Sequence, residues 1–256
     1  MRYILALVIL LAGVVPACAE RPATDYQLYA EGKYDEAIKA GLAANDAVGF
    51  AQAARATLAE DASRDKPCLE CLQRAEDYAR RAVAADPKLS DARVYLAYAL
   101  GLETHIEGSL QARLKGYPGQ AKRALDAALA ADPKNAWALA ARGSWNIAIV
   151  RGGGATFAGL FYGATLKNGM DDFAAAFNAA PDNMIVLYQY ALTLSEYDAV
   201  HYHDYIATAL THVMRTKADT AYERLMQKRA GELQELLKTG DLAAYLARVR
   251  KYQGYP

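Results

Sequence analysis

Apolar and small residues recur every three or four positions along most of the chain, and no stretch alternates apolar and polar residues with period two. Between residues 121 and 150 the apolar pattern runs through Leu125 and Leu129, stops at Pro133, and resumes at Trp137. Because this spacing keeps apolar residues on one helical face and proline cannot continue a helix, the stretch predicts helix, turn, helix. The chain as a whole is therefore predicted to be all-α.

The same stretch places particular residue types where two helices would cross. Ala121, Ala128 and Gly143 are small, Leu125 is large, and Pro133 follows the end of the first helix. These five positions match, type by type, a junction of the tetratricopeptide repeat family, which the chain resembles there. The resemblance implies an all-α, right-handed α-solenoid of about four to five helix pairs, ending in capping helices.

Two further stretches carry resemblances. The segment from Gly32 to Ile38 reads GKYDEAI, in which Gly32 would form the turn of a repeat and Tyr34 would begin the second helix. Residues 143–177 resemble, more faintly, the helical-repeat domain of the regulator-of-microtubule-dynamics proteins. The second resemblance implies only a divergent tetratricopeptide fold.

The spacing of the helix-ending prolines predicts longer units than usual. Pro87, Pro133 and Pro181 lie 46 and 48 residues apart, whereas this repeat closes in about 34 residues. The extra residues are expected between the two helices of a unit, at 103–119 and 151–168, where they would form two long loops on one edge. Drift in length at a tolerant surface position explains the same spacing.

The N-terminus is typical of a bacterial secretory signal. Arg2 precedes an apolar run over residues 4–15, and Pro16 is followed by the small residues Ala17-Cys18-Ala19. Cleavage is expected after Ala19, which makes residues 1–19 a signal peptide and residues 20–256 a single helical-repeat domain in the periplasm or secreted. The alternative is a lipid anchor on Cys18. No later segment is apolar enough to span a membrane.

Composition narrows the choice of partner. Lys and Arg together number 29, as do Asp and Glu, so no net field favours nucleic acid or an acidic membrane. The chain has 18 tyrosines against five phenylalanines. Tyrosine suits surfaces that are half buried and half wet, so this excess indicates binding faces.

Cys68 and Cys71 form a Cys-x-x-Cys pair at the start of a predicted helix. In an oxidising compartment a local disulfide is expected, and free thiols or a redox-active pair are the alternatives. No histidine follows Cys71, which excludes the motif for covalent haem attachment, and a zinc site would need a second pair of ligands.

No constellation of residues points to an enzyme. The run Arg151-Gly152-Gly153-Gly154 lacks the features of a nucleotide-binding loop, so an anion contact and a flexible turn leaving a helix both fit it. His201 and His203 would point about 200° apart on a helix and cannot share a metal ion. No catalytic residue, cofactor or metal site is expected.

The predicted function is binding through the concave face of the solenoid, which the first helix of each unit lines. The candidate residues on that face are Arg93, Tyr98, Trp137, Arg142, Trp145, Asn146, Tyr188 and Tyr190. The candidates in the second long segment are Arg151, Phe157, Phe161 and Tyr162. The leading hypothesis is an exported adaptor that binds a protein or peptide. The alternative is a small-ligand-binding accessory of a periplasmic solute transport system, since repeat lipoproteins associated with tripartite periplasmic transporters look similar in size and architecture.

Overall fold

Thirteen α-helices and no strand make up residues 24–256, which are the residues that this computed structural model describes. The helices are α1 (Asp25–Glu31), α2 (Tyr34–Ala44), α3 (Ala47–Ala62), α4 (Leu69–Ala85), α5 (Ser90–Glu107), α6 (Ser109–Leu114), α7 (Tyr117–Ala131), α8 (Ala136–Tyr162), α9 (Leu166–Ala179), α10 (Met184–Asp198), α11 (His203–Arg215), α12 (Ala221–Thr239) and α13 (Leu242–Tyr252). The prediction of an all-α fold is confirmed. The expected signal peptide and Cys18 lie outside the described residues.

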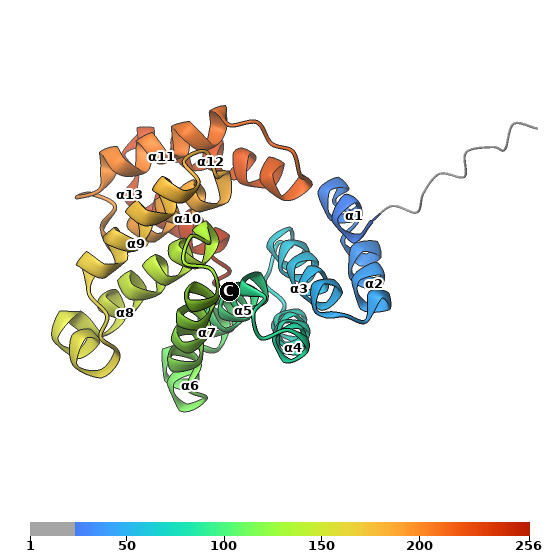
Figure 1. The fold of residues 1–256 in the computed structure, drawn as a ribbon. Helices are drawn as coiled ribbons and strands as arrows, with labels where there is room; N and C mark the ends of the chain where they lie inside the picture. Colours follow the sequence, from blue (N-terminus) through green and yellow to red (C-terminus); the bar gives the residue numbers. More distant parts are fainter. Residues whose placement is uncertain (1–23) are drawn as a thin grey trace, which may run out of the picture.

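The helices are arranged in two curved rows. Each helix packs against its neighbours in sequence, and α3, α5, α8, α10 and α12 also contact one another in that order, which makes them the inner row. Helices α4, α7, α9 and α11 pack outside this row, between its members (Figure 1). No helix of residues 24–256 is long and apolar enough to cross a membrane.

Side chains at the helix starts fix where the units begin. Asn135 accepts hydrogen bonds from the backbone N–H groups of Trp137 and Ala138, as expected for a helix cap. Asn183 does the same at the start of α10. At the start of α1 the cap is Thr24, which forms a reciprocal capping box with Gln27.

The two segments expected to be long loops are mostly helical, so that prediction was wrong. In the first, α5 continues to Glu107, α6 follows, and α7 begins at Tyr117. In the second, α8 continues to Tyr162, but Gly154 has a non-helical conformation (φ 77°, ψ 159°) that divides it into two helical stretches. Glycine adopts this conformation without steric cost, so the chain turns sharply at Gly154 and then resumes as helix.

The last helices fold back against the first. The Arg224 guanidinium donates to the Ala30 carbonyl (3.3 Å), and the Arg229 guanidinium donates to the Ala62 carbonyl at the end of α3. Figure 1 shows α12 reaching towards α1, and it places the C-terminus at the centre of the molecule, beside α5. The inner row is therefore curved into a nearly closed ring.

A candidate ligand-binding cavity

The centre of the ring contains a partly enclosed cavity of about 330 Å³. Its walls come from α3, α5, α7, α8 and α10, and residues of α12 and of the segment after α13 cover it from the other side. The aromatic side chains among its lining residues are Tyr29, Tyr95, Tyr98, Tyr117, Trp137, Trp145, Tyr188, Tyr222 and Tyr252. Both tryptophans of the sequence are in this set.

One end of the cavity is an aromatic box around Arg55. The guanidinium carbon lies 4.0 Å from the ring centroid of Tyr29 and 5.1 Å from that of Trp137. Tyr95 packs beside Trp137, with ring centroids 6.3 Å apart. Burial raises the pKa of Tyr29 to about 12, although the charge of Arg55 acts in the opposite direction. Burial also raises the pKa of Tyr95, so both phenols are neutral near pH 7.

The opposite end is closed by the C-terminal segment. The His105 ring stacks on Tyr255 with centroids 4.1 Å apart, and its Nδ1 lies 2.7 Å from the Gln253 carbonyl oxygen. The Tyr255 hydroxyl donates to Glu196 (2.7 Å), which also forms an ion pair with Arg151 (2.6 Å). Burial lowers the pKa of His105, which favours the neutral ring. The charges of Arg151 and Glu196 at this end are therefore paired with each other.

Three polar atoms on lining residues are buried without a hydrogen-bond partner among residues 24–256. They are the Trp137 indole Nε1, the Tyr188 hydroxyl and the Gln253 side-chain oxygen. Buried polar groups are satisfied in most proteins, and each exception needs a physical reason. These three are among seven such atoms in residues 24–256, and the other four belong to residues outside the cavity lining.

The cavity gathers part of the set of concave-face candidates. Tyr98, Trp137, Trp145 and Tyr188 line it, and so does Arg151 from the second long segment. All five stand on the inner-row helices α5, α8 and α10.

The other concave-face candidates lie elsewhere. Arg93 bonds to the Pro87 carbonyl at the helix start (2.8 Å). Arg142 and Asn146 both contact Asp172 of α9, the former in an ion pair of 2.6 Å, so they join α8 to α9. Tyr190 packs edge-on against Phe173 at 4.9 Å and lines a separate, more open hollow beside α11. Arg142, Asn146 and Tyr190 therefore join α8 and α10 to α9, whereas the contact of Arg93 is local.

The aromatic candidates of the second long segment cluster at the far end of α8. Phe157 and Phe161 have ring centroids 4.7 Å apart, and Phe161 is 65% exposed. Tyr162 stands edge-on to Trp145 at 6.0 Å and packs behind the cavity wall. None of the three is among the cavity-lining residues.

Sequence reasoning missed Arg55 and the covering residues of α12. Arg55 is the single cation in α3, a helix otherwise rich in alanine, and this isolated charge was an available signal. Tyr222, Met226 and Arg229 carry no such signal, because their approach to α3 depends on closure of the ring.

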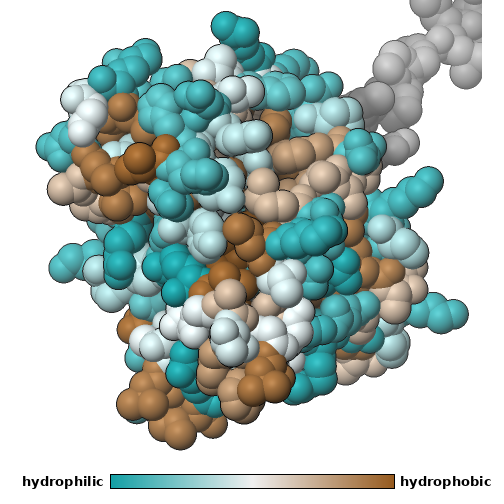
Figure 2. Space-filling model, turned by 90° about the vertical axis from the view of Figure 1, so that its left-hand side faces the viewer, coloured by the Kyte–Doolittle hydropathy of each residue, from teal (hydrophilic) through white to brown (hydrophobic). Residues whose placement is uncertain are grey.

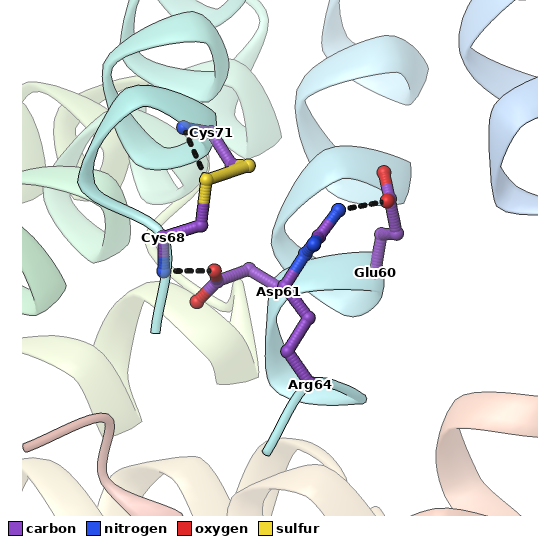
Figure 3. The surroundings of a disulfide bond; sticks show 5 residues. All are labelled: Glu60, Asp61, Arg64, Cys68 and Cys71. Carbon is purple, nitrogen blue, oxygen red and sulfur yellow. Dashed lines mark hydrogen bonds and ion pairs between the residues drawn. A yellow bond between two sulfur atoms is a disulfide. The ribbon is translucent and has the colours of Figure 1, made fainter. Parts of the chain in front are cut away.

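Cys68 and Cys71 form a disulfide at the start of α4. The Asp61 carboxylate at the end of α3 accepts a hydrogen bond from the Cys68 backbone N–H (2.8 Å), as Figure 3 shows. The Asp61 oxygen and the two sulfurs lie within 4.8 Å of one another, but disulfide sulfurs are not thiolate ligands. This arrangement joins α3 to α4 beside the cavity wall.

A buried carboxyl group lies behind the same wall. Glu103 of α5 is 0% exposed and accepts a hydrogen bond from the Tyr117 hydroxyl (2.9 Å). Burial raises its pKa to about 7, the Tyr117 hydrogen bond acts against the rise, and Glu76 and Glu107 add to it. The native protein therefore keeps this group protonated at pH values where the unfolded chain, with a pKa of 4.5, does not.

Acidification is expected to stabilise the protein through Glu103. Between pH 4.5 and about 7 the native state binds more protons than the unfolded state, so the free energy of unfolding falls as the pH rises through this window. The contribution of the protonated Glu103 is fully lost above about pH 7. At about pH 8 the free energy of unfolding of the Glu103→Gln variant should exceed that of the natural protein by roughly 2 kcal/mol. At about pH 5 this difference should be much smaller. Urea unfolding of both proteins at both pH values measures this, and parallel pH dependences would contradict it.

In comparisons with known proteins, no protein-family model matches the chain, and no curated protein matches it.

Proposed function

We propose that the protein binds a small organic molecule in the central cavity and does not transform it chemically. The observation that carries this proposal is the cavity itself, with its aromatic walls and its position at the centre of the inner row. Cavities that hold small molecules are mostly apolar, contain a few placed polar groups, and begin at about 300 Å³.

The ring closure is the reason for preferring a small ligand to a peptide. A peptide adaptor would use the inner face as an open groove, but Tyr222, Met226 and Arg229 of α12 stand over that face. An extended peptide would have to displace them and break the hydrogen bond from Arg229 to Ala62. The remaining space suits a compact molecule.

The resemblance noted above gives this binding a biological setting. The two-row arrangement of helices supports assignment of the chain to divergent tetratricopeptide arrays, and the N-terminal sequence supports export. We therefore propose a periplasmic binding component of a solute transport system. The mass of the mature protein from its own cells would test for cleavage after Ala19 or lipidation of Cys18.

A protein partner is the second candidate, and a different surface favours it. Leu110 and Leu114 of α6 are 70% and 74% exposed, and Leu160 and Phe161 of α8 are 76% and 65% exposed. Arg113 stacks over Phe157 at 5.3 Å, which joins α6 to the end of α8. Figure 2 shows apolar surface gathered along the lower part of one face. Exposed apolar patches of this kind mark interaction sites in many proteins.

Filling the cavity is expected to abolish small-molecule binding. Gly101 of α5 lines the cavity, and a Cβ added there meets no atom within 4 Å, so Gly101→Phe projects a ring into the space without a clash. The neutral dye N-phenyl-1-naphthylamine, which fluoresces in apolar surroundings, serves as the probe. The natural protein should bind it and quench tryptophan emission, since both tryptophans line the cavity, and Gly101→Phe should bind it at least about tenfold more weakly.

The matched control is Gly159→Phe. Gly159 also has open space around an added Cβ, and it lies outside the cavity, so this variant should bind the dye as the natural protein does. Equal binding by the natural protein and Gly101→Phe would contradict the proposed function. Mass spectrometry of the native protein from its own cells should find a small molecule in the natural protein and not in Gly101→Phe.

A further inference from the structure

We propose that Arg55 binds the carboxylate of the ligand, so that the cavity selects monocarboxylates with an aromatic or other apolar body. This inference rests on the proposed function, because it names the chemical class of the molecule in the same cavity. It starts from a charge that the protein leaves without a counter-ion.

Arg55 differs from most of the other cations around the cavity. Arg64 is paired with Glu60 at 2.5 Å, Arg151 with Glu196 at 2.6 Å, and Lys251 with Asp65 at 3.7 Å. Arg229 has no acidic partner either, but its guanidinium donates to the Ala62 carbonyl. Within residues 24–256, Arg55 forms no ion pair, and its side-chain hydrogen bond is to the neutral Tyr29 hydroxyl, so no carboxylate accepts from it. A guanidinium carries five N–H donors, so its hydrogen-bonding capacity is left open.

The aromatic box fixes the plane of this guanidinium. The group stacks over Tyr29 at 4.0 Å and also lies 5.1 Å from the Trp137 ring. Rings that cover the faces of a guanidinium leave its edges as the place for hydrogen bonds. The group therefore presents a planar pair of N–H donors with little freedom left to lose, which is the geometry that binds a carboxylate through two parallel bonds.

The acidic groups that line the cavity compete little with an incoming anion for Arg55. Of the acidic groups there, Glu196 and Asp65 face Arg151 and Lys251, and Asp61 accepts the Cys68 N–H. Burial raises the pKa of Tyr29 and Tyr95, so these phenols stay neutral beside Arg55. A partly buried, unpaired charge is unfavourable, and an incoming carboxylate removes that penalty.

The surroundings also decide between anion types. A phosphate or sulfate keeps its charge on several oxygens and is usually held by several cations or by a helix N-terminus. Here Arg55 stands at the edge of an apolar space walled by Tyr95, Tyr98 and Trp137. The other lining guanidinium without a carboxylate partner, that of Arg229, already donates to the Ala62 carbonyl. One carboxylate on an apolar body satisfies both parts of the site.

The test compares an acid with its amide of nearly the same shape. Binding of 3-phenylpropionate and 3-phenylpropanamide is measured by tryptophan fluorescence at about pH 7 on the natural protein, Arg55→Met and Arg55→Lys. The natural protein should prefer the acid by roughly tenfold to a hundredfold, because charge-assisted bonds are about twice as strong as neutral ones. Arg55→Met should lose this preference and still bind the amide, and Arg55→Lys should restore part of it.

Arg81→Met is the control, because Arg81 also stacks on an aromatic ring, that of Phe50 at 4.0 Å, but lies outside the cavity. It should keep the preference for the acid. The inference would be overturned if the natural protein bound the acid and the amide equally, or if Arg55→Met kept the preference for the acid. Either result is compatible with a dye experiment in which Gly101→Phe still supports the cavity. Binding of neither probe would also overturn it. Failure of the proposed function is distinct, because it appears as dye binding that Gly101→Phe does not change.

Discussion

Replacing Phe173 with alanine is expected to lower the free energy of unfolding by about 4 kcal/mol. The Phe173 side chain is 1% exposed and packs against Tyr190 at 4.9 Å and Phe177 at 6.3 Å between ring centroids. It also presses on α8 at Gly143, where an added Cβ would lie 2.9 Å from the ring. Truncation removes the apolar contacts and leaves a hole that the rigid helix pair cannot close. Urea denaturation, followed by circular dichroism, measures the loss.

The control for this prediction is Phe161→Ala. Phe161 is 65% exposed at the end of α8, so its removal should change stability by less than about 0.5 kcal/mol. If the two variants unfolded at the same urea concentration, the close packing of Phe173 between α9 and α8 would be contradicted.

Replacing Gly41 with alanine is expected to cost about 3 kcal/mol. Helices α2 and α3 cross where Gly41 meets Gly49, and an added Cβ on Gly41 would lie 2.5 Å from the Gly49 carbonyl oxygen. That atom belongs to the backbone, so no side-chain rotation relieves the clash, and the two helices must separate. Thermal unfolding should show the melting temperature falling by roughly 6 to 12 °C.

Gly231→Ala in α12 is the matched control for this variant. The nearest atom to an added Cβ there is the Met214 sulfur at 3.7 Å, an ordinary contact. Alanine is the better helix former by about 1 kcal/mol, so this variant should be as stable as the natural protein or more so. A Gly41→Ala variant as stable as Gly231→Ala would rule out the close crossing of α2 and α3.

The boundaries of several helices could be predicted from sequence because short-range chemistry sets them. Asn135 caps α8 and Pro133 follows the end of α7, and both effects depend on residues a few positions away. The two long segments were predicted wrongly because repeat spacing reveals that residues were added and says nothing about their conformation. Only the local backbone shows that Gly154 divides α8 into two helical stretches.

The direction in which the inner-row side chains point could not be predicted from the sequence, and the reason is physical. Helices α8 and α10 are apolar around most of their circumference, because each is packed between outer helices on one side and the centre of the ring on the other. Such helices have no polar face from which orientation can be read. Tyr188 and Tyr190 were therefore equivalent in the sequence, yet the first faces the cavity and the second faces α9 and α11.

The hydrogen bond from Arg224 to Ala30 joins residues 194 positions apart. Helices that contact only their sequence neighbours assemble quickly as the chain lengthens, whereas a contact of this separation must wait until α12 exists and must overcome the entropy of a long loop. The seam between the first and last helices is thus expected to form late in folding. Until it does, the cavity lacks Tyr222 and the other lining residues of α12, and Arg55 is left on the uncovered face of α3.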